Sequence, residues 1–322
     1  MVISKTPFRI SLFGGSTDYE SFYSQYGSLL IGFGVDKYCY VLARDTPKIF
    51  NYKTKVHYAS TEIVNDNEDI KHNGIRGVLQ YLKIKDGLEI SHLADLPSQT
   101  GIGSSSSFIV GLLKCLHYLK HNVINKQLLA QQAIHIERKL LAETGGVQDQ
   151  IWATYGGMNS IHIDTDGSFE VKPLPISDNL IREFFNRTIL IHTGRTRQSY
   201  KIAQSYNNYD ALSHKHKIAD IAQLGYEKFI DGDIDTIAHL LHKSWMEKQN
   251  ISPLVSNKSV NKMYDILQED GMIGGKLLGT GGQGFIFGIL DNGVDISKFK
   301  SKYKSKYVSC GLSEHGSIII NN

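Results

Sequence analysis

The chain has 322 residues, of which 41% are hydrophobic and 21% are charged. This balance is typical of a globular protein and excludes a disordered or fibrous one, and the length favours two domains. The 35 Lys and Arg against 32 Asp and Glu leave a formal net charge of +3, without a run of like charges that would mark a nucleic-acid-binding arm. We therefore expect no nucleic-acid partner.

Cysteine usage and hydropathy indicate the compartment. The three cysteines, Cys39, Cys115 and Cys310, are odd in number and too widely spaced for a disulfide framework or a cysteine metal site. The N-terminus lacks the apolar region of a signal peptide, and the apolar runs are too short to span a bilayer. We expect a cytoplasmic protein that does not bind a membrane.

The first predicted element is a strand over residues 2–13. Phe8, Ile10 and Leu12 would lie on one face of it, and Arg9, Ser11 and Phe13 on the other. Pro7 cannot donate a hydrogen bond to a neighbouring strand, so this strand lies at an edge or carries a bulge. It ends at Gly14 and Gly15, and the following segment 16–18 has the composition of a loop or a helix cap. Further strands are expected over 35–43 and 88–94.

Two helices follow in the first half. Apolar residues at helical spacing predict one helix over 104–119, directly after a glycine-rich turn, and another over 126–143 that stops at the glycines 145–146. Glu137 borders the apolar stripe of the second helix. A carboxylate at such a position either lies in solvent at the flank of the helix or turns inward toward a ligand, and the pattern leaves both open.

The second half has its own strands and helices. The polar stretch 176–187 and the apolar strand 188–192 separate the halves, and we expect domains at 1–182 and 183–322. Beyond this boundary the pattern predicts helices near 214–243 and 257–269 and strands over 285–290 and 317–320.

Two glycine-rich segments are candidate phosphate sites. The first, residues 101–107 (GIGSSSS), precedes the helix at 104–119, so backbone N–H groups and the positive end of the helix dipole favour an anion in the turn. The residues of this cradle would be Gly101, Gly103, Ser104, Ser105 and Ser106. The alternative is a flexible turn with serine at the helix N-cap.

The second segment, residues 279–284 (GTGGQG), formally matches the GxGxxG fingerprint of dinucleotide-binding folds. That fingerprint follows a strand and opens a helix, whereas these glycines lead into the strand at 285–290. A nicotinamide-dependent oxidoreductase is therefore disfavoured. The GxxxxGK[ST] loop and the HRD and DFG signatures of protein kinases do not occur in the sequence.

Three segments together resemble a known family. Residues 6–19 (TPFRISLFGGSTDY), 96–105 (LPSQTGIGSS) and 275–284 (GKLLGTGGQG) resemble the first, second and third motifs of the GHMP small-molecule kinases, in the family's order and spacing. Within that superfamily the chain is most similar to D-glycero-D-manno-heptose 7-phosphate kinases, and fucokinase-like enzymes share much of the pattern. The similarity is also carried by residues 36–38, 146–150, 156–157 and 193–197.

The motifs depart from the family's pattern at two positions. Ser16 stands where the heptose kinases usually have a third glycine, and Gln283 interrupts the usual glycine run of the third motif. Neither change removes a charged catalytic group. The first falls where contacts to the sugar are expected.

The resemblance implies an α+β protein with the two-domain GHMP kinase fold, made of a ribosomal-protein-S5-like N-terminal domain and a ferredoxin-like C-terminal domain with the substrates in the cleft between them. It implies an enzyme that uses ATP and Mg²⁺ to phosphorylate the anomeric hydroxyl of D-glycero-D-manno-heptose 7-phosphate. The 1,7-bisphosphate would feed nucleotide-activated heptose synthesis, and the partners would be ATP and a sugar phosphate.

The resemblance also implies roles in catalysis. Ser105 and Glu137 would ligate Mg²⁺, which prefers few protein oxygens together with phosphate and water. Asp149 would lie beside the acceptor hydroxyl, as a general base or through its charge alone, and Arg9 would pair with it or touch the transferred group. Without the resemblance, a helix cap is the simpler explanation of Asp149, and Arg9 is a surface arginine of its strand.

The same motifs imply an acceptor site. Asp18 would accept hydrogen bonds from sugar hydroxyls, although a loop cap is the alternative. The other expected sugar contacts are Gly14, Gly15, Ser16, Gly281 and Gly282. A substrate that already carries phosphate needs cationic side chains to bind that phosphate. The alternative is an ordinary surface cation, which is common. The candidates are Arg197, Arg195 and Lys37.

Two related functions stay open. A kinase of the same family with another acceptor, such as L-fucose, galactose or a mevalonate-type alcohol, would be distinguished by an acceptor screen. A catalytically silent ligand sensor of the same fold would release no ADP. The residues expected in catalysis are all present, which favours an enzyme over a sensor.

Overall fold

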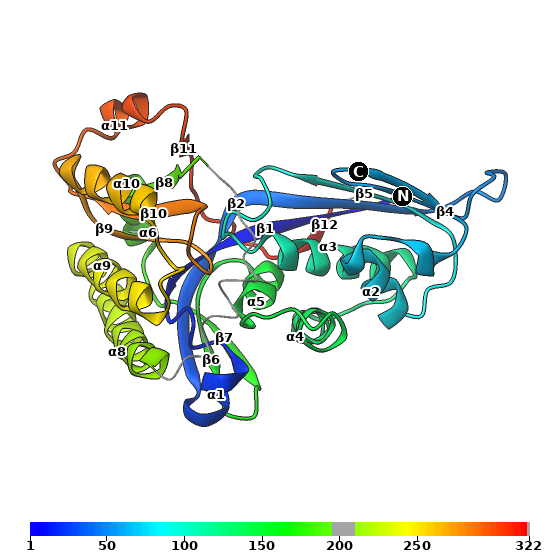
Figure 1. The fold of residues 1–322 in the computed structure, drawn as a ribbon, viewed down its shortest axis with the longest axis horizontal. Coiled ribbons are helices and arrows are strands. Elements are labelled where there is room, and N and C mark those ends of the chain that lie inside the picture. The colour runs from blue at the N-terminus through cyan, green and yellow to red at the C-terminus, as the bar shows by residue number, and fades with distance from the viewer. Residues whose placement is uncertain (195–209, 321–322) are drawn as a thin grey trace.

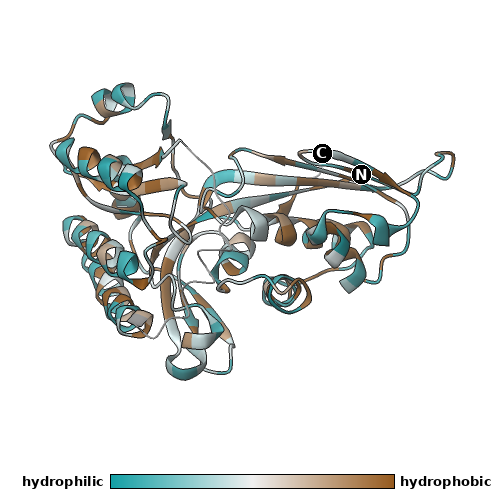
Figure 2. Ribbon diagram, in the orientation of Figure 1, coloured by the Kyte–Doolittle hydropathy of each residue, from teal (hydrophilic) through white to brown (hydrophobic). Residues whose placement is uncertain are grey.

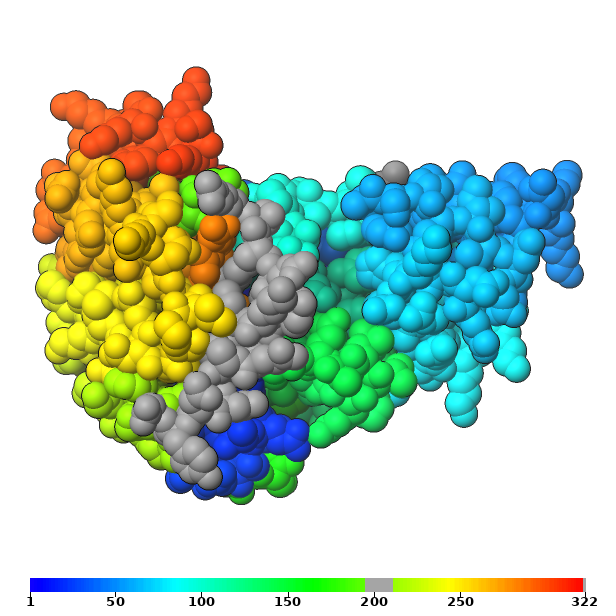
Figure 3. All heavy atoms as spheres, in the orientation of Figure 1, coloured from blue at the N-terminus to red at the C-terminus, as the bar shows by residue number. Residues whose placement is uncertain are grey.

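A computed structural model describes residues 1–194 and 210–320 of the chain. Two sheets, each accompanied by helices, lie at the two ends of an elongated molecule (Figure 1). The space-filling view shows helices of the second half (yellow and orange) on one side and residues 54–94 (blue to cyan) on the other (Figure 3). The mixture of helices with two mainly antiparallel sheets confirms the expected α+β class. Within the described residues, no helix combines the length and the apolar character needed to cross a bilayer.

The larger sheet is built around two long strands. β1 pairs antiparallel with β2 along nearly its whole length, and a register shift between Pro7 and Phe8 is the bulge that the proline predicts. The first part of β2 pairs with β6 and its second part with β5. The order is β12-β1-β2-β5-β3-β4, with β6 and β7 attached through β2. The strands are β1 (Val2–Phe13), β2 (Ser28–Asp45), β3 (Thr54–His57), β4 (Thr61–Val64), β5 (Leu88–Ala94), β6 (Met158–Ile163), β7 (Phe169–Pro173) and β12 (Ile318–Ile319).

Helices lie along one face of this sheet (Figure 1). The central one, α3, packs against β1 and β2, and nearly all its residues from 106 to 116 are buried as a result. α4 continues directly into a π-helical turn over Ile136–Leu140. The helices of this half are α1 (Glu20–Tyr26), α2 (Asn73–Tyr81), α3 (Ser104–Leu119), α4 (Lys126–His135) and α5 (Gln148–Tyr155), with a 3₁₀ turn at Asn67–Asp69.

The smaller sheet is antiparallel, with the order β11-β8-β10-β9. α9 packs against β9 and also against α8, so the helices of the second half form a layer beside this sheet (Figure 1). The strands are β8 (Thr188–His192), β9 (Met272–Leu277), β10 (Phe285–Leu290) and β11 (Tyr307–Val308). The helices are α6 (Asp178–Arg187), α8 (Asp210–Asp231), α9 (Ile234–Ile251), α10 (Lys258–Glu269) and α11 (Ile296–Lys302).

The end of the chain returns to the larger sheet. β12, expected as a closing strand of the second half, pairs with β1 through Ser4 and Lys5. α6 spans residue 182, at which the domains were expected to divide. One hydrophobic cluster also joins residues of both halves, so the core does not mark a boundary between them. The division at residue 182 therefore stays a prediction.

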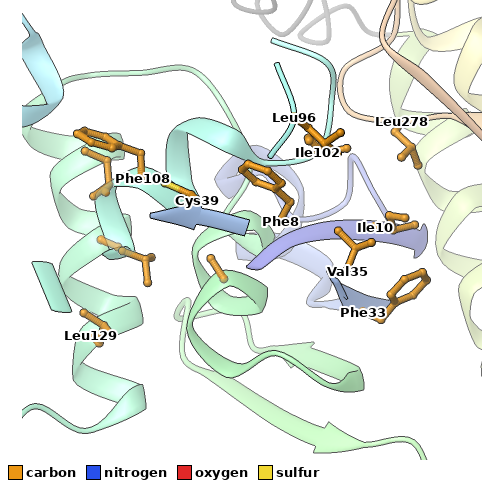
Figure 4. Packing of buried hydrophobic residues seen from close by; sticks show 14 of the residues in the cluster. Phe8, Ile10, Phe33, Val35, Cys39, Leu96, Ile102, Phe108, Leu129 and Leu278 are labelled. Carbon is orange, nitrogen blue, oxygen red and sulfur yellow. The ribbon is translucent and has the colours of Figure 1, made fainter. Parts of the chain in front are cut away.

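That cluster fixes the turn before α3 against both sheets. Figure 4 shows apolar side chains of β1 and β2 packed together with those that flank the glycine-rich turn. Its members include Phe8, Ile10, Phe33, Val35, Leu96, Ile102 and Leu278, the last from the smaller sheet's side. Hydropathy colouring shows apolar residues on the faces where helices meet the sheets and polar residues on the outside (Figure 2). The glycine-rich turn is thereby held at the junction of the two halves.

Candidate active site

Two adjacent hollows lie at the junction of the two halves. The first, which we call the polar hollow, has a volume of about 160 Å³ and is lined mainly by charged and hydroxyl side chains of the first half, together with Lys248 and Lys276. The second, which we call the ring hollow, has a volume of about 660 Å³ and is lined by aromatic and imidazole rings beside the glycine-rich turn. The residues that border both are Arg9, Ser105, Asp149, Gly279 and Thr280.

Arg9 and Asp149 form a bidentate ion pair at this border. Nε of Arg9 donates to Oδ1 of Asp149 at 2.7 Å and Nη2 donates to Oδ2 at 2.8 Å. The third nitrogen, Nη1, donates to the carbonyl oxygen of Gly101 at 2.6 Å. The Arg9 side chain is 5% exposed, whereas that of Asp149 is 24% exposed. The carboxylate is therefore fixed by a buried guanidinium and still reaches the cavity.

Asp149 does not cap its helix. It lies in the first turn of α5, whose N-cap residue Val147 makes no side-chain cap hydrogen bond. Both carboxylate oxygens are instead used by Arg9. The cap explanation of Asp149 is thus contradicted, and the pairing with Arg9 that the resemblance implied is present.

The second and third motifs meet backbone to backbone. A Cβ added at Gly101 would lie 2.5 Å from the carbonyl oxygen of Leu278, and one added at Gly279 would lie 2.4 Å from Cα of Gly101. Only glycine fits at both positions. The glycine-rich segment of the second half therefore packs on the turn before α3, and it does not open a helix of its own.

The N-terminus of α3 opens toward the hollows. Gly103 is its N-cap residue, with φ of 75° in the left-handed region, and it lines the ring hollow together with Ser104. Ser105 is exposed and lines both hollows. Ser106 is buried, and its hydroxyl donates to Oε2 of Glu137 at 2.7 Å. The four residues thus present N–H and hydroxyl groups at the place where the turn was expected to bind phosphate.

Glu137 is buried at the floor of the polar hollow. It lies in the π-helical turn after α4 and accepts hydrogen bonds from Ser106 and from the side-chain amide of Gln150. Burial raises the pKa of Glu137 to about 7, opposed by the guanidinium of Arg138. Among the described residues Oε1 of Glu137 has no hydrogen-bond partner. The inward alternative for Glu137 is therefore the observed one.

Asp18 is a buried carboxylate that also lines the polar hollow. Its carboxylate accepts hydrogen bonds from the backbone N–H of Ser16 at 3.1 Å and of Gln148 at 3.3 Å. Burial and the nearby charge of Asp149 raise the pKa of Asp18. Gly15 and Ser16 line the same hollow. Gly14 does not, because it packs beneath the backbone of Leu29.

Three other predicted acceptor residues, all within the described part of the chain, line neither hollow. Gly281 and Gly282 are buried against Val255, while their neighbours Gly279 and Thr280 line the cavity. Lys37 lines neither hollow, and its ammonium pairs with Asp36 at 2.9 Å. Arg195 and Arg197 lie outside the described residues.

Sequence reasoning missed two groups of lining residues. Lys276 and Lys248 are buried cations of the polar hollow. For Lys276 the available signal was a lysine directly before two leucines in the third motif. His72 and His92 line the ring hollow, with ring centroids 5.1 Å and 4.8 Å from that of Phe108. Burial lowers the pKa of both histidines. No sequence signal links these rings, because they come from separate elements.

Comparison with known proteins places the chain among kinases. Residues 73–157 match the GHMP kinases N terminal domain, and residues 226–309 match the GHMP kinases C terminal domain. A D-glycero-alpha-D-manno-heptose 7-phosphate kinase of Campylobacter jejuni is 30% identical over 301 residues, 89% of each chain. A bifunctional fucokinase/GDP-fucose pyrophosphorylase of Arabidopsis thaliana is 28% identical over 62% of this chain and 19% of its own length.

Solved structures share the fold. A D-glycero-D-manno-heptose 1-phosphate kinase from Bacteroides thetaiotaomicron superposes with a TM-score of 0.82 at 21% identity and covers all of this chain and 99% of that one. A Lactococcus lactis galactokinase superposes with a TM-score of 0.78 at 16% identity, over 98% of this chain and 94% of the other. The two matched domains and the relative that aligns over 89% of both chains show that the chain is a member of the GHMP kinase family.

Proposed function

We propose that the protein transfers the γ-phosphoryl group of ATP to the anomeric hydroxyl of D-glycero-D-manno-heptose 7-phosphate, in the cytoplasm, giving the 1,7-bisphosphate. The observation that carries the proposal is the Arg9–Asp149 pair at the border of two hollows. A carboxylate fixed between a nucleotide site and an acceptor site is what phosphoryl transfer to a hydroxyl requires. The choice of acceptor is supported by the relative that covers 89% of the chain.

The ring hollow suits the nucleotide. Its rings offer flat apolar surface for a base, and the lowered pKa values of His72 and His92 favour uncharged imidazoles there. The same hollow includes the N-terminal turn of α3, whose N–H groups and helix dipole favour phosphate. The γ-phosphoryl group would then reach the border formed by Arg9, Asp149 and Ser105.

The polar hollow suits the acceptor sugar. Asp18 is fixed by two backbone N–H groups and presents a carboxylate to hydroxyl groups in the cavity. Asp149 takes the proton of the anomeric hydroxyl, or lowers the barrier through its charge, as the oxygen attacks the γ-phosphorus and ADP leaves. Arg9 holds Asp149 in place and adds positive charge where the transferred group passes.

The residues present fit Mg²⁺. Oε1 of Glu137 is buried without a hydrogen-bond partner among the described residues, and the exposed hydroxyl of Ser105 lines the same hollow. Mg²⁺ commonly takes one or two carboxylates and completes its coordination with phosphate and water. Glu137 and Ser105 would hold the ion, which would neutralise charge on the phosphates of ATP.

Phosphorus NMR of the product tests the proposal. Incubation with Mg-ATP and heptose 7-phosphate is expected to yield ADP and a second sugar phosphate resonance that couples to the anomeric proton. A product phosphorylated at another carbon would contradict the assignment of the acceptor hydroxyl. Turnover of L-fucose or galactose in preference to the heptose phosphate would contradict the substrate and keep the kinase.

A further inference from the structure

Three lysines of the second half are almost fully buried, and two of them line the polar hollow. Lys276 of β9, Lys248 of α9 and Lys215 of α8 are 3%, 5% and 5% exposed, and no other lysine in residues 1–194 and 210–320 is buried. Lys276 and Lys248 line the hollow. The ammonium of Lys215 lies 5.8 Å from the ring centre of Tyr19, another lining residue. Lysine is rarely buried unless an acceptor or an anion compensates its charge.

Lys276 shows how little of that compensation the protein itself supplies. Its Nζ donates to the carbonyl oxygen of Leu12 at 2.9 Å, which uses one of three donors. Within the described part of the chain, no carboxylate lies within ion-pair distance of it. Burial lowers the pKa of Lys276 to about 7; repulsion from Arg9 lowers it further, and attraction to Asp18 opposes the change. An anion in the hollow would supply the missing partner.

We propose that Lys276 and Lys248 bind the phosphate group that the acceptor carries before the reaction, with Lys215 adding positive potential behind Tyr19. This inference rests on the proposed function, because it requires an acceptor that is already phosphorylated. It assigns the phosphate-binding role to lysines of the second half. Lys37, one of the cations that the sequence suggested for this role, lies away from both hollows.

The position of the lysines favours the acceptor's phosphate over that of ATP. The γ-phosphoryl group must pass the border residues that both hollows share, and neither lysine is among them. Both lysines line only the polar hollow, in which Asp18 also lies. One substrate that presents hydroxyls to Asp18 and a phosphate to Lys276 satisfies both groups, and it brings a dianion to the remaining donors of Lys276. Lys248, whose ammonium donates to the carbonyl oxygen of Gly279, adds a second buried positive charge to the same hollow.

Steady-state kinetics with two acceptors test the assignment. Lys276→Met and Lys248→Met are compared with wild type on D-glycero-D-manno-heptose 7-phosphate and on the same heptose without phosphate. Lys243→Met is the matched control, because it removes an exposed lysine from the same helix as Lys248. The melting temperature of each variant verifies folding, and Lys248→Met carries the test if Lys276→Met does not fold.

Lys276→Met is expected to raise KM for the heptose 7-phosphate by roughly 10- to 100-fold, the range for losing a charged hydrogen bond. KM for the unphosphorylated heptose and KM for ATP are expected to change less than about threefold. Equal losses on both acceptors, or a rise confined to ATP, would overturn the assignment while the proposed function stands. Wild-type turnover of unphosphorylated sugars alone would contradict the proposed function itself, and that result is visible before any variant is made.

Discussion

Single residues at the border of the two hollows carry the chemistry that the fold makes possible. Arg9 comes from β1 and Asp149 from the first turn of α5, 140 residues apart in the sequence. Without the family resemblance, the sequence favoured a helix cap for Asp149 and a surface position for Arg9, because the partner of a side chain cannot be read from its own neighbours. Their bidentate contact separates the explanations.

Asp149→Asn is expected to lower kcat by about 10²-fold or more, the range for removal of a positioned general base. KM for ATP is expected to stay near wild type because asparagine keeps the shape, whereas the melting temperature is expected to fall because the amide accepts only one of the two hydrogen bonds from the buried Arg9. The control is Asp178→Asn, which changes an exposed carboxylate in the first turn of α6. Wild-type turnover of Asp149→Asn would contradict the catalytic role.

Ser16 departs from the family's glycine but keeps a glycine-like backbone. Its φ is 89°, in the left-handed region, which costs a side chain about 1–2 kcal/mol. Ser16→Gly is expected to raise the free energy of unfolding by about 0.5–1 kcal/mol, because this relief exceeds the added entropy of glycine in the unfolded chain.

Urea unfolding measures the effect of Ser16→Gly against Ser24→Gly, which places glycine in the exposed part of α1 and should destabilise. A loss of stability in both variants would show that residue 16 gains nothing from glycine.

At the scale of elements, periodicity predicted the strands and helices better than their ends. β2 begins at Ser28, earlier than the expected strand over 35–43. Its first part was not predicted because Gly32 and Gly34 weaken the strand pattern there. The helical pattern over 214–243 is two helices, α8 and α9, which separate at Gly232 with φ of 74°. Such a break depends on the backbone conformation of one residue, and the spacing of apolar residues does not reveal that conformation.

The inward position of Glu137 could not be predicted from the helical pattern that contains it. The expected helix over 126–143 treats Glu137 as the flank of an α-helical stripe. In the structure the carboxylate lies inside, where Ser106 and Gln150 donate to it. The direction of this carboxylate depends on donors from α3 and α5, which the apolar period of its own helix does not contain.

Glu137→Gln is expected to raise the Mg²⁺ concentration for half-maximal activity by at least about tenfold, because the amide keeps the shape and loses the charge. Titration of Mg²⁺ at saturating ATP measures the change, with the exposed Glu170→Gln as control. An unchanged Mg²⁺ dependence in a folded variant would rule out Glu137 as the ligand.

For the whole molecule, the sequence motifs indicated the family and hence the two-sheet architecture. The residues that the second half contributes to the site were harder to predict from the sequence, because their role depends on how the two halves meet. Lys276 of β9 reaches the carbonyl of Leu12 at the end of β1, across 264 residues. The return of β12 to the larger sheet likewise depends on packing between the halves.

The buried lysine makes the stability of the ligand-free protein depend on pH. The pKa of Lys276 is lowered from 10.5 to about 7, so between these values the unfolded chain binds a proton that the folded protein does not. Lowering the pH through this window therefore destabilises the fold. Lys276→Met lacks the effect, and its melting temperature relative to wild type is expected to rise from pH 10 to pH 7 and to level off below. A constant difference across this range would contradict the lowered pKa.

ADP release from Mg-ATP in the presence of D-glycero-D-manno-heptose 7-phosphate tests the central claim most directly, namely that the paired hollows join ATP to a phosphorylated sugar. Wild type is assayed beside Asp149→Asn, and galactose and unphosphorylated heptose are the comparison acceptors. The predicted result is rapid release that requires the heptose 7-phosphate and falls by about 10²-fold in the variant. Release that is equal with all acceptors, or equal in both proteins, would contradict it.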